Sequence, residues 1–419
     1  MTERGNKMST EAKQNEKIAA AVMGYGTIGS GVVEILEKNR DVIAKKVGKE
    51  IEAKYILDLR EFPGTPVEHK IVHDIAAITE DPAVKIVVEA MGGVHPAYEF
   101  AKACLMAGKH VITSNKALVA ACGTELLQIA REKQVNFLFE ASTGGGIPVI
   151  RTMYRSLAGE KIEEITGILN GTTNYILTKM DRCGQTFESA LKEAQDLGYA
   201  ERNPEADVEG HDTCRKIAIL TAMATGKEVN YEDIPTEGIT RITDMDFKYA
   251  EKLGRSVKLF GSSRIEGDKV TAFVAPVMIG PEHPLYSVND VYNGIVIKGN
   301  MLGTSMYFGS GAGKLPTASA VVADMMEAAI YEGENIPLGW TEEKQEIEPW
   351  ENASFRYFLR ISGNSQSKKE KVTEVFPDGE IVELSGCCEF GVLTSKMSGA
   401  ELNQKKAAIS DVIGLIRAE

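Results

Sequence analysis

Two charged residues, Asp212 and Lys216, stand just ahead of a run of branched apolar residues in the segment EADVEGHDTCRKIAIL. Residues four apart on a helix share a face, so the carboxylate and the ammonium are expected to be neighbours. The next positions on that face are apolar, which indicates a buried stripe. An ion pair on a helix surface would contribute only about 0.3–0.5 kcal/mol and have no chemical role. A pair at an active site would orient a lysine that transfers protons. These residues alone leave both interpretations open.

A glycine-rich segment, GYGTIGSG, follows an apolar strand near the start of the chain and opens a predicted helix. Gly24, Gly26 and Gly29 have the G-x-G-x-x-G spacing that allows a tight turn, close approach of a pyrophosphate and close packing of helix on strand. The alternative is a plain turn. Asp58 ends the next strand and could accept hydrogen bonds from an adenosine ribose, whereas Arg60 could face a 2′-phosphate. The segment therefore predicts dinucleotide binding and leaves NAD and NADP open.

Polar residues also stand at the ends of two later predicted strands. Ser114, Asn115 and Lys116 follow one apolar run, and Glu140 follows another and precedes a glycine cluster. Ligands of open α/β sheets bind at the carboxyl ends of the strands, so these positions are candidates for ligand contacts. Lys116 alone could equally be a solvated residue at a helix start, and the glycine cluster could be only a hinge.

The composition excludes several classes of function. A chain of 419 residues with a net charge of −13 and no Lys/Arg-rich cluster is not expected to bind nucleic acid or an anionic membrane. A small-molecule substrate fits better. The first sixteen residues lack the apolar region of a signal peptide, and no run of eighteen apolar residues follows, which predicts a soluble cytoplasmic protein. Six scattered cysteines without a C-x-x-C pair predict reduced thiols.

Hydrophobic periodicity predicts an α/β fold. From Lys17 to about Ser142, apolar strands alternate with helices, which is typical of a Rossmann-type, doubly wound parallel sheet. Beyond it, helices including one at about 148–157 mix with alternating segments such as KVTAFVAPVMI. That pattern predicts a second, α+β domain whose antiparallel or mixed sheet has one covered face. The tail from Ala353 shows three strands with helices between and after them, which predicts a small α+β domain.

Six segments resemble those of homoserine dehydrogenases in order and approximate spacing: MGYGTIGSGV, GKHVITSNKALVA, EASTGGGIPVI, GILNGTTNYIL, YAERNPEADVEGHDTCRK and GSGAGKLPTASAV. The resemblance runs from about Lys17 to Glu334. NGTTNYIL together with EADVEGHD makes a coincidental match improbable. The resemblance implies an oxidoreductase that interconverts L-homoserine and L-aspartate 4-semialdehyde with NAD or NADP, in threonine and methionine biosynthesis.

The resemblance also implies roles for individual residues. Lys216 matches the general acid/base lysine of the family, with Asp212 beside it, and Lys116 matches a second lysine beside the reacting carbon. Acids and a pocket threonine would bind the substrate: Glu201, Asp207, Asp212 and Thr172. The cofactor would contact Gly24, Gly26, Thr27, Ile28, Gly29, Asp58, Arg60, Gly92, Ser114, Lys116, Gly311 and Gly313. The chemistry agrees, because carboxylates suit the ammonium of an amino acid and a lysine can pass the proton that accompanies hydride transfer.

A monovalent cation is a further implication of the resemblance. In the family, the loop that begins at Glu140 holds such an ion, here Na⁺ or K⁺, mainly through backbone carbonyls. The matching carbonyls belong to Glu140, Thr143, Gly145 and Ile147. Thr143 stands where an apolar residue is common, but the carbonyl is the ligand.

The expected domains are a disordered segment (1–16), the dinucleotide-binding domain (17–147), the catalytic and dimerisation domain (148–308), a glycine loop and helix returning to the cofactor domain (309–340), a linker (341–352) and a degenerate ACT-like tail (353–419). ACT modules usually carry a D-x-P-G-V turn, where this chain has SGNSQSKKEK. The tail is therefore expected to support dimerisation or structure rather than threonine control. We expect a homodimer or homotetramer. Alternatives are a dehydrogenase for another small amino acid or aldehyde, or a catalytically silent nucleotide sensor.

Overall fold

The computed structural model describes residues 17–419, so the segment expected to be disordered, 1–16, lies outside the described residues. The described chain divides into two compact units. The first unit contains the described residues up to Gly159 together with 222–228 and 309–344. The second unit contains 160–221, 229–308 and 345–419, and thus includes the whole tail.

A six-stranded parallel sheet forms the centre of the first unit. Its strand order is β3-β2-β1-β4-β5-β6, the arrangement of doubly wound nucleotide-binding folds, so the predicted Rossmann-type sheet is confirmed. Strands β4 and β5 are almost completely buried because helices cover both faces. The strands are β1 (Lys17–Met23), β2 (Glu50–Leu57), β3 (Ile71–Val72), β4 (Val84–Glu89), β5 (His110–Thr113) and β6 (Phe137–Leu138).

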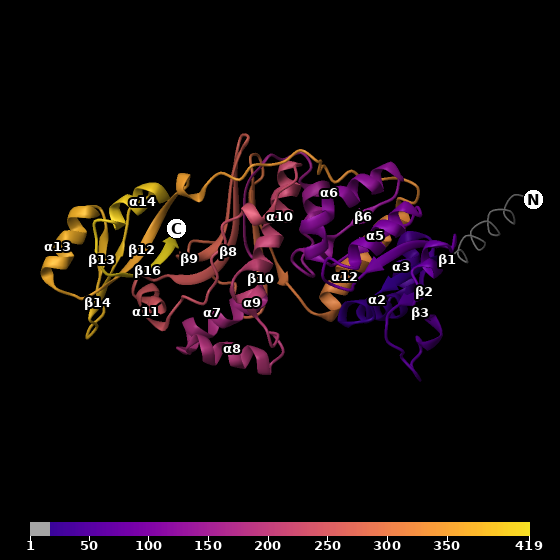
Figure 1. The fold of residues 1–419 in the computed structure, drawn as a ribbon, viewed down its shortest axis with the longest axis horizontal. Coiled ribbons are helices and arrows are strands. Elements are labelled where there is room, and N and C mark those ends of the chain that lie inside the picture. The colour runs from indigo at the N-terminus through magenta and orange to yellow at the C-terminus, as the bar shows by residue number, and fades with distance from the viewer. Residues whose placement is uncertain (1–16) are drawn as a thin grey trace, which may run out of the picture. The chain divides into compact units, whose positions relative to one another are not determined.

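The helices of the first unit come from two separate stretches of the chain. Figure 1 shows α12, in orange, among the indigo and magenta elements, and α12 packs against α2. The helix predicted over 148–157 forms instead as a π-helical segment (Thr152–Ser156), and the Glu140 carboxylate accepts hydrogen bonds from the backbone nitrogens of Ile150 and Arg151 just ahead of it. The α-helices are α2 (Thr27–Lys38), α3 (Arg40–Val47), α4 (Ala76–Thr79), α5 (Ala97–Met106), α6 (Lys116–Glu132) and α12 (Lys314–Ile330).

The second unit is built on a ten-stranded mixed sheet, as predicted, with the order β11-β10-β7-β8-β9-β16-β12-β14-β13 and with β15 paired to β12. The C-terminal strand β16 pairs in parallel with β9 and antiparallel with β12. Its strands are β7 (Ile162–Ile168), β8 (Ser256–Glu266), β9 (Lys269–Ile279), β10 (Tyr292–Gly299), β11 (Gly303–Ser310), β12 (Ser354–Ser362), β13 (Glu380–Val382), β14 (Glu389–Leu393), β15 (Met397–Ser398) and β16 (Val412–Ala418).

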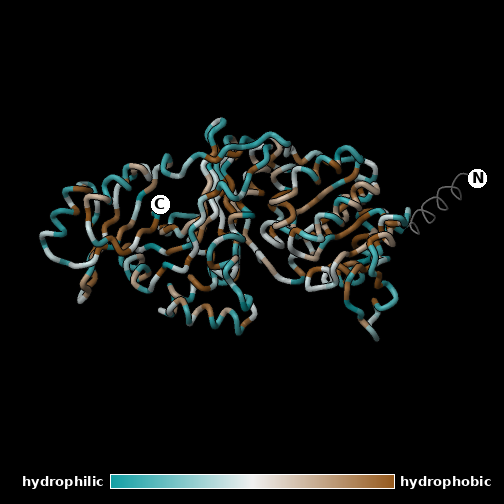
Figure 2. Tube along the Cα trace, viewed as in Figure 1, coloured by the Kyte–Doolittle hydropathy of each residue, from teal (hydrophilic) through white to brown (hydrophobic). Residues whose placement is uncertain are grey.

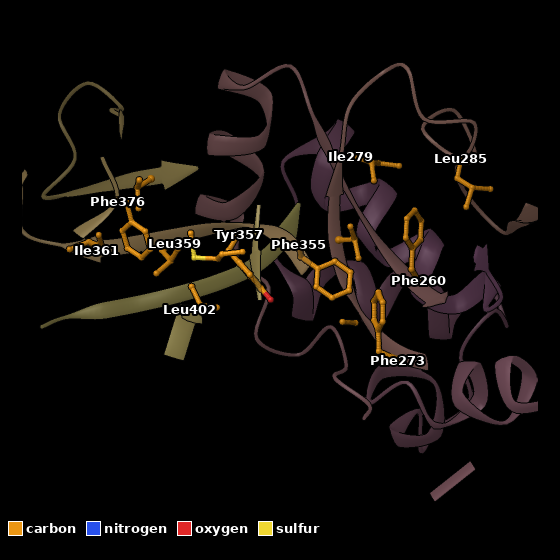
Figure 3. Close-up of a cluster of buried hydrophobic side chains, with 14 of the residues drawn as sticks. Phe260, Phe273, Ile279, Leu285, Phe355, Tyr357, Leu359, Ile361, Phe376 and Leu402 are labelled. Carbon is orange, nitrogen blue, oxygen red and sulfur yellow. The ribbon is translucent and has the colours of Figure 1, made fainter. Parts of the chain in front are cut away.

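Strand β9 corrects the prediction of one covered face, because its residues from Ala272 to Ile279 are all buried. Val274 faces the turn at Gly210, ahead of the helix α10 (His211–Thr225). Phe273 faces the other way, into a cluster of buried apolar residues (Figure 3), where its ring centroid lies 5.2 Å from that of Phe355 on β12. The tail therefore shares one apolar core with the rest of this sheet.

The tail has two strands more than the sequence predicted, β15 and β16. Helix α14 (Gly399–Lys406) follows β15, but the chain then ends in β16 rather than in a helix. The ACT-like character of the tail stays a prediction. Figure 2 shows the hydrophobic stretches along the strands of each unit and polar stretches on the outer helices. The remaining α-helices are α7 (Gly171–Cys183), α8 (Phe187–Asp196), α9 (Glu205–Val208), α10 (His211–Thr225), α11 (Asp244–Lys252) and α13 (Gln366–Val375).

Among residues 17–419, the structure holds no helix with both the length and the apolar character needed to cross a membrane.

Candidate active site

The charged pair on α10 is buried. Asp212 is 3 % exposed and Lys216 is 8 % exposed, which excludes the interpretation as a pair on a helix surface. The Lys216 Nζ atom lies 2.7 Å from Asp212 Oδ2 and donates a hydrogen bond of 2.7 Å to the carbonyl oxygen of Leu169, at the end of β7. Removing two charges from water costs several kcal/mol each, so a buried pair of this kind needs further polar partners. These partners come from the turn between β7 and α7.

Asn170 is the partner that connects the acids. Its Nδ2 donates one hydrogen bond of 2.7 Å to Asp207 Oδ1 and another of 2.9 Å to Asp212 Oδ2. Its Oδ1 accepts from the backbone nitrogen of Thr173 at 2.8 Å and so caps α7. The sequence motif NGTTNYIL contains this residue, but no role was predicted for it. A polar residue directly after a buried strand and before a helix is the signal that points to such a position.

The other predicted substrate residues lie on both sides of this cluster. Thr172, in the first turn of α7, donates a hydrogen bond of 2.6 Å to the carbonyl oxygen of Tyr199. The side chain of Glu201 is exposed, and its carbonyl oxygen accepts from Gln195 Nε2 at 3.2 Å.

In the first unit, the glycine loop has the shape that a dinucleotide requires. Gly24 has a φ of +92°, and a Cβ atom there would lie 2.8 Å from the carbonyl oxygen of Ala90. A Cβ atom at Gly29 would lie 1.9 Å from the carbonyl oxygen of Gly24, so a side chain is excluded at both positions. No heavy atom lies within 4 Å of the Cβ position of Gly26. This open side, next to the start of α2 at Thr27 and Ile28, suits a pyrophosphate.

Asp58 and Arg60 form one unit beside this loop. Asp58 Oδ2 accepts a hydrogen bond of 2.8 Å from the backbone nitrogen of Tyr25, which lies between two of the loop glycines. The guanidinium of Arg60 binds the same carboxylate through Nε and Nη2, each at 2.9 Å. This contact holds the pKa of Asp58 well below its usual range. The Arg60 side chain is 62 % exposed, so its charge remains accessible to an anionic ligand.

A buried carboxylate that was not predicted, Glu89, lies at the carboxyl end of β4. It is 0 % exposed and accepts hydrogen bonds from Thr113 Oγ1 at 2.5 Å and from the backbone nitrogens of Met91 and Gly92 at 2.8 and 3.4 Å. Glu89 therefore holds the loop that contains the predicted cofactor residue Gly92 against β5.

The start of α6 is tied to the same loop. Asn115 caps α6, and its Nδ2 donates a hydrogen bond of 2.6 Å to the carbonyl oxygen of Gly93. The Asn115 backbone nitrogen binds Thr113 Oγ1 at 2.9 Å. Ser114 and Lys116 flank this cap, so the predicted residues after β4 and β5 lie on two loops that are joined by hydrogen bonds.

The loop from Glu140 to Gly145 is buried in the first unit. The Glu140 backbone nitrogen donates a hydrogen bond of 2.9 Å to Asp324 Oδ2, and burial raises the pKa of the Glu140 carboxylate. Among the described residues, the hydroxyls of Ser142 and Thr143 are buried and have no hydrogen-bond partner. Such hydroxyls are unusual in a protein interior and indicate a polar environment suited to a ligand.

Gly311, a residue predicted to contact the cofactor, lies against this loop. A Cβ atom at Gly145 would lie 2.4 Å from the carbonyl oxygen of Gly311, so the backbones of the two glycines touch. Gly313 then begins α12. No cluster of three or more His, Cys, Asp or Glu side chains that could hold a metal occurs in residues 17–419.

The sequence was compared with models of protein families. Residues 24–140 match the NAD binding domain of homoserine dehydrogenase, and residues 148–326 match the homoserine dehydrogenase domain. The first match begins at the first glycine of the loop, and the second includes Asn170, Asp207, Asp212 and Lys216.

Comparison with individual proteins gives the same result. The chain is 36 % identical to a homoserine dehydrogenase of Bacillus subtilis over 372 residues, 86 % of this chain and 85 % of that protein. Its fold matches the crystal structure of a homoserine dehydrogenase from Thiobacillus denitrificans with a TM-score of 0.89 and 32 % identity, over 97 % of this chain and 99 % of that one. A hyperthermophilic archaeal homoserine dehydrogenase in complex with NADPH matches with a TM-score of 0.64 and 27 % identity, over 75 % of this chain and 98 % of that one. The chain therefore belongs to the homoserine dehydrogenase family of NAD(P)-dependent oxidoreductases, as its motifs predicted.

Proposed function

We propose that Lys216 transfers the proton in the homoserine dehydrogenase reaction of this chain. Oxidation of L-homoserine to L-aspartate 4-semialdehyde moves a hydride from the hydroxyl-bearing carbon to the nicotinamide and a proton from the hydroxyl to a base. The buried position of Lys216 between Asp212 and the Leu169 carbonyl is the observation that carries this assignment. Two acceptors orient the amine, and Asp212 thereby acts as its positioning residue. In the reverse direction the same ammonium returns the proton to the aldehyde oxygen.

The acids near Lys216 are proposed to bind the substrate. Asp207 and Asp212 share the Asn170 amide, so two carboxylates are available for the single ammonium of homoserine. Thr172 begins the helix beside them, and Glu201 is proposed as a third acid that contacts the substrate.

Lys116 is proposed as the second lysine of the reaction. It begins α6, next to the Asn115 cap that is joined to the loop after β4. In this role its ammonium would lie beside the reacting carbon and contact the cofactor together with Ser114 and Gly92.

The first unit provides residues that fit NAD or NADP. The open space at Gly26 and the start of α2 suit the pyrophosphate, and the Asp58–Arg60 pair suits the adenosine ribose or its 2′-phosphate. The bound cofactor supplies hydride acceptance and return. The residues proposed to hold it are Gly24, Gly26, Thr27, Ile28, Gly29, Asp58, Arg60, Gly92, Ser114, Lys116, Gly311 and Gly313.

A monovalent cation, Na⁺ or K⁺, is proposed at the carbonyls of Glu140, Thr143, Gly145 and Ile147. The buried, unpartnered hydroxyls of Ser142 and Thr143 support a polar ligand at this loop. The test compares initial rates in choline chloride, NaCl and KCl at equal ionic strength. Rates that require Na⁺ or K⁺ support the ion, and equal rates in all three salts contradict it.

Assembly into a homodimer or homotetramer is also proposed. Strand β11 is an edge of the ten-stranded sheet, and it exposes Met306 and Phe308. The ring of Phe308 lies 5.2 Å from that of the exposed Tyr292 on β10, which makes a small apolar patch. Exposed apolar patches and sheet edges commonly pair with another chain. Sedimentation of the full chain measures the state directly, and a monomer at micromolar concentration would contradict the proposal.

The activity is tested by following the absorbance of the reduced nicotinamide with purified protein, L-homoserine and each cofactor. We expect reduction of NAD or NADP that depends on homoserine. Binding of the cofactor without any turnover would favour the silent regulator, and faster turnover of another small amino acid would favour a related dehydrogenase.

A further inference from the structure

We propose that Asn170 is a positioning residue that holds the Asp207 and Asp212 carboxylates side by side. The inference rests on the proposed function, because it assumes that these acids bind the substrate ammonium. Asn170 is proposed to act through these two acids, without contacting the reacting carbon or the cofactor.

Both N–H groups of the Asn170 side-chain amide donate hydrogen bonds. Its Nδ2 has two hydrogens, and each reaches a different carboxylate, at 2.7 Å for Asp207 and 2.9 Å for Asp212. Its Oδ1 faces the amide of Thr173. A flipped side chain would direct its oxygen at two carboxylates and its NH₂ group at a backbone N–H, so only one orientation satisfies all partners. Asn170 is 5 % exposed, and water cannot easily replace these bonds.

The neutral charge of the amide matters as much as its geometry. Asp207 and Asp212 each carry a negative charge and Lys216 carries a positive charge, and the Asn170 amide adds no further charge to this group. A lysine or arginine at position 170 would also hold the two acids together, but it would add a positive charge and compete with the substrate. An asparagine supplies the donors without a charge.

The turn after β7 places the acids and the lysine together. The Leu169 carbonyl accepts from Lys216 Nζ, and the next side chain, Asn170, binds the acids. Both residues are fixed because β7 ends and α7 begins there. Asn170 also caps α7, so any test must separate this structural role from the positioning role.

The substitution Asn170→Ser separates them, because serine is as good a helix cap but cannot reach both carboxylates. Without the amide the two carboxylates are no longer held side by side, so we expect KM for homoserine to rise about tenfold or more. KM for NAD(P) should change little. As a matched control, Thr186→Ala removes the cap of α8 in the same unit and should lower stability without changing KM for homoserine.

A second substitution, Asn170→Asp, keeps the cap and the shape and adds a negative charge. An aspartate lacks the two N–H donors and can no longer join Asp207 to Asp212, so KM for homoserine should change in this variant as well. A role confined to the cap of α7 predicts an unchanged KM. Unchanged KM for homoserine in both variants overturns the inference. Failure of the proposed function is distinct, because the unaltered chain would then show no turnover of homoserine.

Discussion

The rings of Phe273 on β9 and Phe355 on β12 pack edge to face, with centroids 5.2 Å apart. This contact joins the tail to the catalytic sheet, and the C-terminal strand β16 lies between these two strands in the sheet order. The tail therefore contributes to the core of the second unit.

Phe355→Ala should therefore destabilise the second unit as a core substitution does. Phe355 is 8 % exposed, and replacing a buried phenylalanine by alanine costs about 3–5 kcal/mol. Urea unfolding followed by fluorescence measures the change. Ile413→Ala is the control, since Ile413 is 50 % exposed in the same unit and should lose less than about 1 kcal/mol. Equal losses in the two variants would contradict a shared core.

The Asp58–Arg60 pair predicts how the cofactor is chosen. If Asp58 contacts the ribose hydroxyls, NAD should be used at least as well as NADP, because the carboxylate repels a 2′-phosphate. Asp58→Ala removes this repulsion and releases Arg60, so kcat/KM for NADP relative to NAD should rise, by about tenfold for a single charge contact. Arg60→Ala should shift the ratio the other way. A strong preference of the unaltered protein for NADP would indicate that Arg60, rather than Asp58, determines which cofactor binds.

Asp207→Ala should raise KM for homoserine more than it lowers kcat. An ammonium contact that is present equally in the ground state and the transition state contributes uniform binding, and its loss appears in KM. Steady-state kinetics at saturating cofactor provide the test. Glu205→Ala serves as the control, because Glu205 is an exposed acid on the same short helix. A fall in kcat at unchanged KM would instead place Asp207 in the chemical step.

Stability should fall in mild acid because of His110. Burial lowers the pKa of this residue to about 4, and its Nδ1 accepts the backbone N–H of Asn136 at 3.0 Å. In the unfolded chain His110 binds a proton below a pH of about 6.5, whereas in the folded chain it stays neutral down to about pH 4. The contribution of neutral His110 to the free energy of unfolding is therefore fully present above about pH 6.5. It is lost as the pH falls towards 4, by on the order of 3 kcal/mol.

Unfolding free energies measured from pH 7 to pH 4 isolate this contribution. His110→Asn provides an acceptor that does not titrate, so its unfolding free energy should fall less over this range. His69→Asn changes an exposed histidine and should keep the decline of the unaltered protein. Identical pH dependence in all three proteins would exclude His110 as the cause.

The sequence predicted features that depend on local pattern. Apolar strands alternating with helices identified the parallel sheet, and the apolar face after Lys216 correctly indicated a buried pair. The glycine spacing identified a loop in which Gly24 and Gly29 cannot carry side chains. Each of these signals lies within a few residues of the feature that it predicts.

Features that depend on distant contacts were missed. Asn170 meets Asp207 and Asp212 only because the chain returns to the end of β7 after about forty residues, and no local pattern encodes that approach. Strand β16 was missed for the same reason, since its pairing with β9 joins the C-terminus to a strand far back in the sequence. Glu89 was missed although it ends the apolar run KIVV, the position from which polar residues at two later strands were identified.

Lys216→Ala tests directly whether this lysine transfers the proton. General acid/base residues contribute about 10²–10⁴ in rate, so kcat for homoserine oxidation should fall by about that factor while the dissociation constant for NAD(P) stays nearly unchanged. Lys258→Met is the matched control, because Lys258 is also buried in the second unit and also donates to a backbone carbonyl, that of Val288 at 2.8 Å. This variant should lose stability and keep its turnover. A folded Lys216→Ala protein that oxidises homoserine at the unaltered rate would contradict the assignment of Lys216.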